Sequence, residues 1–360
     1  MKSWLVTGGA GFIGGNFVLR ALARQDVEII NLDNLTYAGN LDTLVSVANH
    51  PRHHFYHGDI CDTKLVSELL AKHRPAALIN FAAESHVDRS IDSPAEFILT
   101  NVNGTLNLLE CALAHWQSLR DVEKASFRYL QVSSDEVFGS LGIEGAFSES
   151  TAYAPNSPYA ASKAAADHLV RAFNRTFDLP TLTTNCSNNY GPYQFPEKLI
   201  PLMILNGLAR RSLPVYGDGL QVRDWLHVHD HCDAIELVLQ SGKPGDVYSI
   251  GGNAEHTNLE VIHALCGLLD QKKPRQDGQI HADLISSVSD RPGHDRRYAI
   301  DFSKLNNELG WHPKVDFKTG LEMTIDWYLA NGYWTDRVLD GSYRGERLGL
   351  GHASGSMTEQ

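Results

Sequence analysis

Short apolar runs alternate with longer segments of helical periodicity through the first half of the chain. The runs are too short for helices and predict buried strands. In the longer segments apolar residues such as Phe12, Phe17 and Leu22 recur at helical spacing, which predicts helices with one buried face. We expect strands at 3–7, 27–32, 54–56, 76–81, 127–133 and 180–185, and helices at 11–24, 63–73, 95–115 and 159–177. Strands that alternate with helices form a parallel sheet covered on both faces, so the pattern predicts an α/β fold.

The rhythm changes after Pro192, where segments become shorter and richer in proline and glycine. This change predicts a smaller second lobe, with a helix at 230–239 and a strand at 247–250 returning to the first domain. We therefore expect a sheet domain over 1–187, to which 224–250 returns, and a C-terminal lobe over 188–335. The small, polar segment 341–360 is expected to be a disordered tail.

Length and charge limit the classes of function. A chain of 360 residues suits one large and one small domain, and its net charge of -12 argues against binding to nucleic acid or to an anionic membrane. No apolar run approaches the roughly 18 residues of a membrane span, and no secretory signal pattern is recognisable. Five scattered cysteines without C-x-x-C pairing are typical of free thiols in a reducing compartment, so we expect a cytoplasmic protein.

A glycine motif, Gly9-x-Gly11-x-x-Gly14, follows the first predicted strand and opens the first helix. Glycines there permit a tight turn and a close approach of the backbone to a pyrophosphate, whose charge the helix N-terminus favours. Asp33 closes the next strand, where a carboxylate accepts hydrogen bonds from ribose hydroxyls and repels a 2′-phosphate. The motif predicts a Rossmann-like, doubly wound parallel sheet that binds NAD rather than NADP, with the smaller C-terminal lobe binding the substrate.

Tyr159 and Lys163 lie one turn apart on a helix that Ser157 and Pro158 are suited to begin. A phenol normally ionises with a pKa of about 10, but a neighbouring ammonium and a positive nicotinamide ring stabilise the phenolate. Tyr159 is therefore the candidate base that takes an alcohol proton as hydride leaves.

Ser134, Asp135 and Glu136 follow a predicted strand and so lie at the carboxyl edge of the sheet, where α/β sites form. Adjacent carboxyl groups can differ in proton affinity, so that one acts as an acid and the other as a base, which is what elimination of water requires. The Ser134 hydroxyl is a candidate hydrogen-bond partner for the same substrate hydroxyl. Spacing alone leaves a solvated Asp-Glu turn open as the alternative.

Three histidines, His227, His229 and His231, stand at alternate positions, which on a strand would place them on one face like metal ligands. We interpret them as incidental and expect no metal.

Longer segments resemble the dTDP-glucose 4,6-dehydratase family, a group of extended short-chain dehydrogenase/reductases, over roughly residues 1–335. The segments that carry this resemblance are 8–14, 35–41, 82–90, 134–139, 159–163, 185–199 and 290–295. The resemblance implies oxidation of a glucosyl C4 by NAD, loss of water across C5 and C6, and return of hydride to C6. It implies that Tyr159 is the C4 base, that Glu136 takes the C5 proton and that Asp135 protonates the C6 hydroxyl. It also implies a homodimer, for which the helices at 95–115 and 159–177 are our candidate interface.

The resemblance assigns roles residue by residue. The expected catalytic set is Ser134, Asp135, Glu136, Tyr159 and Lys163. The expected NAD contacts are Gly8, Gly11, Phe12, Ile13, Gly14, Asp33, Asn34, Leu35, Thr36, Asp59, Ile60, Phe81, Ala82, Ala83, Glu84, Ser85, Thr100, Tyr159, Lys163 and Asn189. The expected contacts with dTDP-glucose are Ser85, His86, Ser134, Asn188, Lys198, Leu199, Pro214, Tyr216, Arg223, Asn258, Arg291 and His294, with the two arginines as pyrophosphate partners.

The chain departs from the family pattern at Ser134, where threonine is usual, and at Phe138, where tyrosine is usual. One alternative is another NAD-dependent sugar-nucleotide enzyme, such as a UDP-sugar 4-epimerase or a UDP-glucose 4,6-dehydratase, which shares the glycines and the Tyr-Lys pair. The other is a non-catalytic dinucleotide sensor, which would have no reason to keep Tyr159, Lys163 and both carboxylates together. The Asp135-Glu136 pair argues against an epimerase, which expels no water. The sequence leaves open the choice of dTDP or UDP and the deoxysugar pathway served, although dTDP-rhamnose synthesis is common in relatives.

Overall fold

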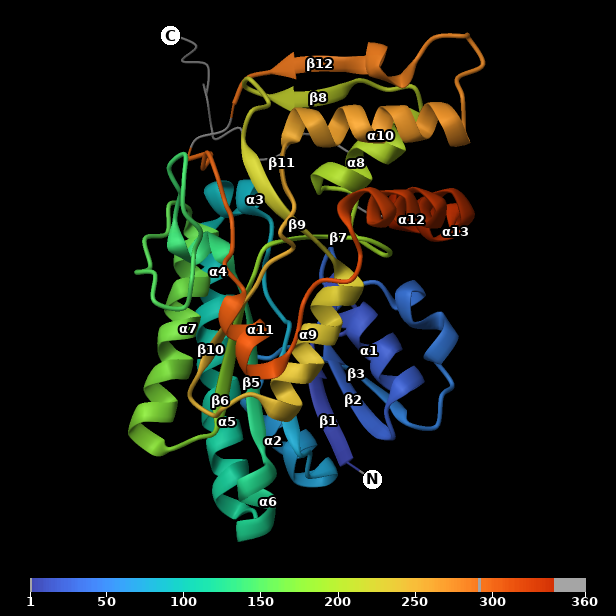
Figure 1. Ribbon diagram of the computed structural model, residues 1–360. Helices are drawn as coiled ribbons and strands as arrows, with labels where there is room; N and C mark the ends of the chain where they lie inside the picture. Colours follow the sequence, from blue (N-terminus) through green and yellow to red (C-terminus); the bar gives the residue numbers. More distant parts are fainter. Residues whose placement is uncertain (1, 291–292, 340–360) are drawn as a thin grey trace, which may run out of the picture.

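A computed structural model describes residues 2–290 and 293–339, in which seven strands form one parallel sheet in the order β3-β2-β1-β4-β5-β6-β10 (Figure 1). The expected contact Arg291 and the expected tail 341–360 lie outside the described residues. The strands of this sheet are β1 (Lys2–Thr7), β2 (Val27–Asp33), β3 (His53–His57), β4 (Ala77–Asn80), β5 (Arg128–Ser134), β6 (Thr181–Cys186) and β10 (Val247–Ile250). The order is that of a doubly wound Rossmann sheet, which confirms the predicted fold class.

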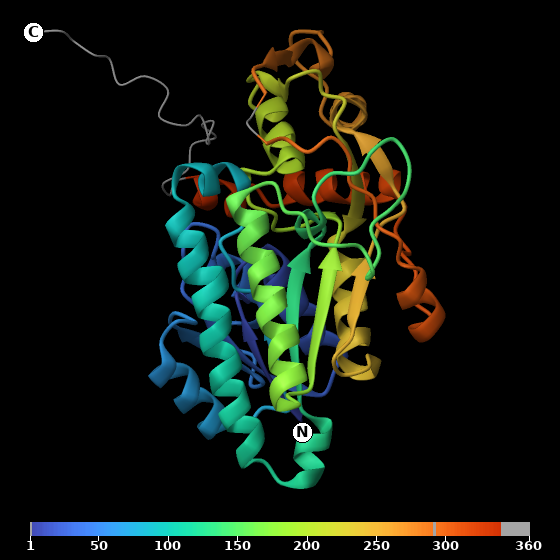
Figure 2. The same ribbon diagram turned by 90° about the vertical axis from the view of Figure 1, so that its left-hand side faces the viewer.

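Both faces of the sheet are buried under helices, as the apolar runs predicted. In β1, Trp4 and Val6 belong to the core beneath one set of helices, whereas Leu5 belongs to the core on the opposite face. The first face is covered by α1 (Phe12–Arg24), α9 (Val228–Ser241) and α11 (Ser303–Leu309) and the second by α2 (Thr63–His73), α5 (Thr105–Ser118) and α7 (Pro158–Phe177) (Figures 1 and 2). The short helices α3 (Val87–Asp92), α4 (Pro94–Phe97) and α6 (Asp121–Ser126) complete this part of the chain.

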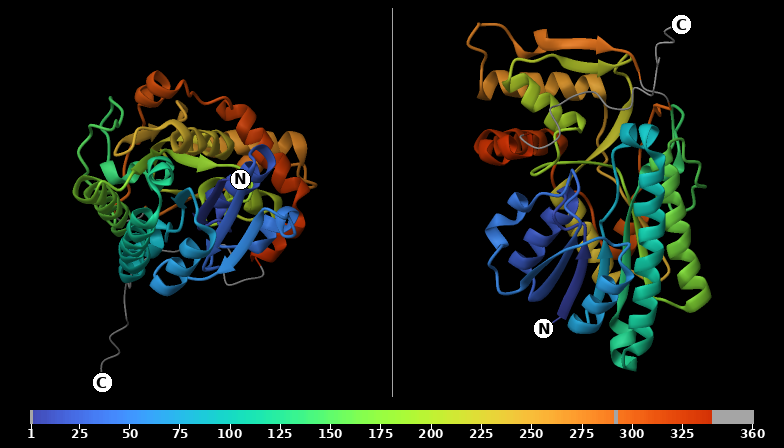
Figure 3. Two further views of the ribbon diagram at one scale, coloured as in Figure 1. Left: turned by 90° about the horizontal axis from the view of Figure 1, so that it is seen from below. Right: turned by 180° about the vertical axis from the view of Figure 1, so that it is seen from behind.

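A smaller lobe with its own hydrophobic core lies over the carboxyl ends of the sheet strands (Figures 1 and 3). It contains a two-stranded sheet of β8 and β12 and a three-stranded sheet in the order β11-β9-β7. Its elements are β7 (Asn188–Tyr190), α8 (Leu199–Leu208), β8 (Leu213–Tyr216), β9 (Val222–His227), β11 (Glu255–Thr257), α10 (Asn258–Lys272), β12 (Ile285–Val288), α12 (Phe317–Ala330) and α13 (Gly332–Leu339). Between β9 and β11 the chain returns to the large sheet as α9 and β10.

Residues 95–115 are helical throughout, as expected, but the hydrogen-bond pattern of this helix changes from α to π and back. After α4 the chain forms a π-helical segment, η2 (Ile98–Gly104), before α5 begins. In this segment Asn101 donates a hydrogen bond to the Ser162 hydroxyl (2.8 Å) and exchanges hydrogen bonds with the backbone of Glu84. A π-helical segment inside a helix often marks a functional region, and here it fixes the loop that follows β4.

The geometry considered for the three histidines is also wrong. His227 ends β9, whereas His229 and His231 lie in α9, which begins at Val228, so the three side chains do not share a strand face. Within residues 2–290 and 293–339 no group of three or more histidine, cysteine, aspartate or glutamate residues is arranged to hold a metal ion. No helix among those residues is both long and apolar enough to cross a membrane.

Candidate active site

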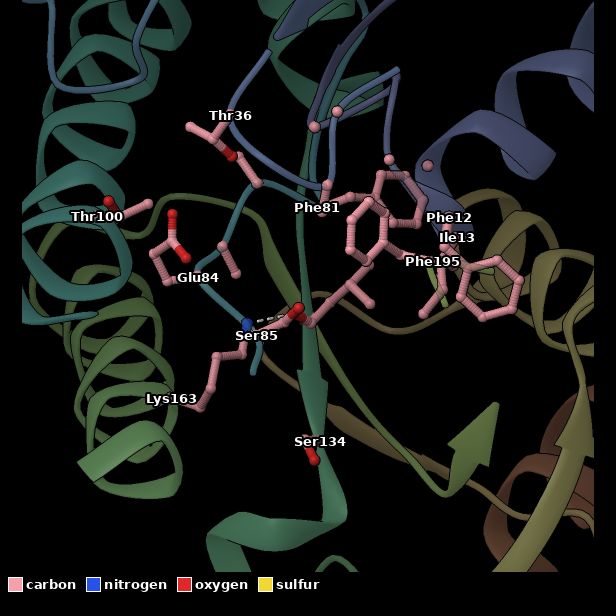
Figure 4. A pocket seen from close by; sticks show the side chains of 18 of the residues that line it. Phe12, Ile13, Thr36, Phe81, Glu84, Ser85, Thr100, Ser134, Lys163 and Phe195 are labelled. Carbon is pink, nitrogen blue, oxygen red and sulfur yellow. Dashed lines mark hydrogen bonds between the residues drawn. The ribbon is translucent and has the colours of Figure 1, made fainter. Parts of the chain in front are cut away.

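The predicted cofactor and catalytic residues meet in one pocket at the carboxyl edge of the sheet (Figure 4). Figure 4 shows Phe12 and Ile13 across this space from Lys163, with Ser134 at the end of β5. The pocket is lined by Gly8, Gly11, Phe12, Ile13, Gly14, Asp33, Asn34, Thr36, Asp59, Ile60, Phe81, Ala82, Ala83, Glu84, Ser85, Thr100, Ser134, Asp135, Glu136, Tyr159, Lys163, Asn188, Asn189 and Lys198 among others. Segments from both halves of the chain therefore enclose one site.

The glycine turn packs so tightly that side chains are excluded. Gly8 has a φ of 71°, and a Cβ there would lie 2.6 Å from the backbone nitrogen of Ala82. A Cβ on Gly14 would overlap the carbonyl oxygen of Gly8. Such a turn leaves the first backbone N–H groups of α1 accessible at the pocket, where an anionic phosphate is favoured.

Replacing Gly14 with alanine is therefore expected to lower the midpoint of thermal unfolding, because the added methyl group forces α1 away from β1. Overpacking of this kind typically costs about 1–3 kcal/mol. Gly267→Ala is the matched control, since this glycine is exposed within α10 and a Cβ there meets nothing within 4 Å. Helix propensity predicts that the control is neutral or stabilising by roughly 1 kcal/mol. Equal midpoints for the two variants would contradict the tight packing.

Asp33 lines the pocket with both carboxylate oxygens oriented by the backbone. Its Oδ2 accepts from the Ala10 N–H and its Oδ1 from the Leu35 N–H, each at 2.8 Å. Burial raises the pKa of this carboxyl group, and the two backbone donors oppose that rise. Each oxygen retains a lone pair that can accept from a ligand hydroxyl, so the geometry suits recognition of a ribose diol.

Helix α7 brings Tyr159 and Lys163 to the pocket. As the sequence predicted, Ser157 caps the helix by accepting from the Ala160 N–H, and Pro158 occupies its first turn. Lys163 Nζ donates to the Val132 carbonyl at 2.8 Å, which fixes the ammonium at the end of β5. Burial raises the pKa of Tyr159 well above its usual value, and a hydrogen bond with Ser134 opposes this effect. Proton removal by Tyr159 therefore requires additional positive charge.

Asp135 and Glu136 begin a 3₁₀ turn, η3 (Asp135–Phe138), directly after β5. Asp135 is only 2% exposed, so a solvated turn, the alternative that spacing left open, does not describe it. Burial, and next the charge of Glu136, raise the pKa of Asp135 well above its usual value, whereas Arg223 lowers it. The direction of this pKa shift favours the protonated carboxyl group, the form that a general acid needs, and Glu136 also lines the pocket.

Other predicted contacts do not line this pocket. These are Leu35, His86, Leu199, Pro214, Tyr216, Arg223, Asn258 and His294. Pro214 and Tyr216 lie on β8, and Asn258 begins α10. The ring centroids of Tyr216 and His294 are 6.4 Å apart, so two of these contacts neighbour each other in the lobe. Their assignment to the substrate stays a prediction.

One pocket residue that sequence reasoning missed is Glu197. Its side chain accepts from the Tyr37 hydroxyl at 3.2 Å, and burial raises the pKa of this carboxyl group to about 7. Its neighbour Lys198 donates to the carbonyl oxygen of Ser85 at 2.8 Å. The available signal was its position beside Lys198 in a proline-containing segment, but nothing in the sequence shows that this carboxylate is buried. Gln194 and Phe195 of the same segment also line the pocket.

Over nearly its full length the chain is similar in sequence to one group of enzymes, the sugar-nucleotide 4,6-dehydratases. The family model described as GDP-mannose 4,6 dehydratase matches residues 5–324. The dTDP-glucose 4,6-dehydratase of Xanthomonas campestris pv. campestris (strain B100) is 61% identical over 349 residues, which cover 97% of this chain and 99% of that protein. The Escherichia coli dTDP-glucose 4,6-dehydratase is 52% identical, with 96% of this chain and 99% of that protein covered.

Solved structures of a dehydratase and of an epimerase resemble this chain in fold. The dTDP-glucose 4,6-dehydratase of Streptomyces venezuelae, solved with NAD bound, superposes with a TM-score of 0.85 at 46% identity and covers 93% of this chain and 99% of its own. The UDP-glucose 4-epimerase of Thermotoga maritima has a TM-score of 0.80 at 26% identity, with 91% of this chain and 99% of that chain covered. The fold is thus shared with epimerases, whereas the sequence is much nearer to the dehydratases.

Proposed function

This chain belongs to the dTDP-glucose 4,6-dehydratase family, and we propose that it converts dTDP-glucose into dTDP-4-keto-6-deoxyglucose and water, as an NAD-dependent lyase. The observation that carries the proposal is the presence of Asp135 and Glu136 in the same pocket as Tyr159 and Lys163. Tyr159 and Lys163 serve oxidation of an alcohol, whereas Asp135 and Glu136 serve elimination of water. An enzyme that only oxidised or epimerised a sugar would need no acid-base pair for the loss of water.

The residues of the glycine turn fit a bound NAD. Gly11, Phe12 and Ile13 line the pocket at the N-terminus of α1, which suits a pyrophosphate, and the Asp33 carboxylate suits an unphosphorylated ribose. When bound, NAD supplies the acceptor for the C4 hydride and returns that hydride to C6. Since the hydride is returned, the proposal requires no net consumption of cofactor.

In the first step Tyr159 takes the proton of the C4 hydroxyl. The Lys163 ammonium, held by the Val132 carbonyl, lowers the cost of the phenolate that Tyr159 must form. Ser134 accepts from the Glu136 N–H at 3.2 Å and lies at the end of β5, where its hydroxyl can orient the same substrate oxygen.

In the second step the new 4-keto group acidifies the C5 proton, which Glu136 removes. Asp135 protonates the C6 hydroxyl as it leaves, and its raised pKa favours this acidic role. Glu136 then returns a proton to C5 while C6 is reduced. Burial of Asp135 excludes water from the group that must deliver the proton.

The remaining expectations belong to the same proposal. The sheet domain over 1–187, with 224–250, would hold NAD, and the lobe over 188–335 would bind the dTDP moiety of the substrate. A homodimer would form through the side-by-side helices α5 and α7 (Figure 2). Exposed apolar side chains support this interface: Ile98 (46% exposed) and Leu99 (54%) lie in η2 before α5, and Phe177 (45%) ends α7.

The test is to incubate the purified protein with dTDP-glucose or with UDP-glucose, without added NAD, and to identify the product. We expect a 4-keto-6-deoxy sugar nucleotide from dTDP-glucose, formed with copurified cofactor. Equal turnover of UDP-glucose would contradict the proposed base preference. Formation of a galactose nucleotide instead would replace the dehydratase proposal with the epimerase.

A further inference from the structure

A buried carboxylate to which the proposed reaction gives no role lies one helical turn after Lys163. Asp167 is 4% exposed on α7. Its Oδ2 accepts hydrogen bonds from the Ser133 hydroxyl (2.7 Å), the Tyr153 hydroxyl (3.0 Å) and the Asn185 side-chain amide (3.2 Å). Its Oδ1 is also buried and accepts no hydrogen bond from the described part of the chain.

The donors to Asp167 come from the strands that end at the pocket. Asn185, on β6, donates from the same amide nitrogen to the carbonyl oxygen of Ser134 at 3.1 Å. Ser133 directly precedes Ser134 on β5. Asp167, on α7, therefore accepts a hydrogen bond directly from Ser133. It is linked to Ser134 indirectly, because Asn185 donates both to Asp167 and to the Ser134 carbonyl oxygen.

The same carboxylate influences the ammonium that the reaction uses. Burial lowers the pKa of Lys163, and the charge of Asp167 opposes that change. Burial raises the pKa of Asp167, while Lys163 and the hydrogen bonds from its donors favour the anion. Three donors directed at one oxygen are an arrangement suited to a carboxylate. A buried cation is costly unless an opposite charge compensates it, so the two groups depend on each other.

We propose that Asp167 is a positioning residue of this active site, which compensates the charge of the buried Lys163 ammonium and holds the backbone of Ser133 and Ser134 below the pocket. This role rests on the proposed function, because it acts through Lys163 on the base Tyr159. The other titratable groups that face this network are Cys186 beside Lys163, Tyr129 and Tyr153 beside Asp167, and Asp135 and Glu136 beside Tyr159.

The first test compares the pH profile of kcat for the wild type and Asp167→Asn. Asparagine can still accept from the three donors but carries no charge. Lys163 should then lose its proton at lower pH, so the alkaline limb of kcat should move down by about one pH unit or more. At neutral pH kcat should fall about tenfold, with KM changed less than about twofold because no proposed substrate contact is removed.

Asp230→Asn is the control for loss of a buried carboxylate elsewhere. Asp230 accepts from the N–H groups of Lys314 and Val315 and lies outside the pocket. It should lower the midpoint of thermal unfolding without moving the pH profile. An unshifted profile in Asp167→Asn, with loss of stability alone, would show that Asp167 is merely structural and would overturn the proposal.

A second readout needs no substrate. The phenolate absorbance of Tyr159 in the NAD-bound protein is obtained as the difference from Tyr159→Phe. Asp167→Asn should move this titration to higher pH, because the stabilising ammonium is lost earlier; an unmoved titration contradicts the role. If the wild type makes no product from dTDP-glucose, the proposed function fails, and this titration still decides the role of Asp167.

Tyr153→Phe decides the case in which Asp167→Asn does not fold. The variant keeps the carboxylate and removes one of its donors, which raises the pKa of Asp167. Because the anion is the active form, the acidic limb of kcat should move to higher pH. An acidic limb identical to that of the wild type would refute the proposal.

Discussion

Glu136→Gln is expected to stop the reaction after C4 oxidation, so that reduced cofactor accumulates on the protein while no product forms. Glutamine has nearly the same shape but cannot take the C5 proton. Tyr159 and Lys163 remain in place for the first step, since they lie on α7 rather than on η3. Loss of a general base typically lowers turnover by roughly 10²–10⁴-fold. The measurement is the absorbance of reduced nicotinamide after the variant is mixed with dTDP-glucose, with product determined in the same sample.

Glu144→Gln provides the control, because this glutamate is exposed in the loop after η3. It should turn over like the wild type and show no lasting reduced cofactor. Normal product formation by Glu136→Gln would remove Glu136 from the mechanism. Loss of both product and reduced cofactor would place Glu136 in the oxidation step instead.

The large sheet could be predicted because strands such as β1 and β4 are buried on both faces and contain short apolar runs. The helix expected at 95–115 is present, but the sequence did not predict the π-helical segment within it. Its π-helical segment is supported by hydrogen bonds from Asn101 to Glu84 and Ser162, which lie far away in the sequence. Helical periodicity alone does not report such partners.

The candidate site was predictable to the extent that its residues follow strand ends. Asp33 and Asp135 each come at the end of a parallel strand, and such ends converge at one edge of the sheet. The sequence does not show which of these carboxyl groups are buried in the folded protein. The pKa of Asp135 is raised by its burial, by the charge of Glu136 and by that of Asp224 on β9, whereas Arg223 on the same strand opposes the rise. Glu197 and Asp167 were missed because only the folded chain shows that they are enclosed.

Tyr159→Phe is expected to slow the first step, so that neither reduced cofactor nor product appears at the normal rate. The variant keeps the ring, whose centroid lies 6.3 Å from that of Phe97, and removes only the hydroxyl. The expected loss of kcat is again roughly 10²–10⁴-fold, the usual contribution of a general base. The rate of the first step is followed by the absorbance of reduced nicotinamide in a single turnover with dTDP-glucose. Tyr333→Phe is the control, because that tyrosine is 71% exposed on α13.

Because C4 oxidation must precede elimination, a variant with both Tyr159 and Glu136 replaced provides a further test. If Tyr159 acts before Glu136, the double variant should accumulate reduced cofactor no faster than Tyr159→Phe alone. Burial raises the pKa of Tyr159, so the step that it catalyses should accelerate with pH until the phenolate is formed, and this dependence should vanish in the phenylalanine variant. Rapid accumulation of reduced cofactor in the double variant would mean that another group removes the C4 proton. Tyr159 would then line the pocket without acting as the base.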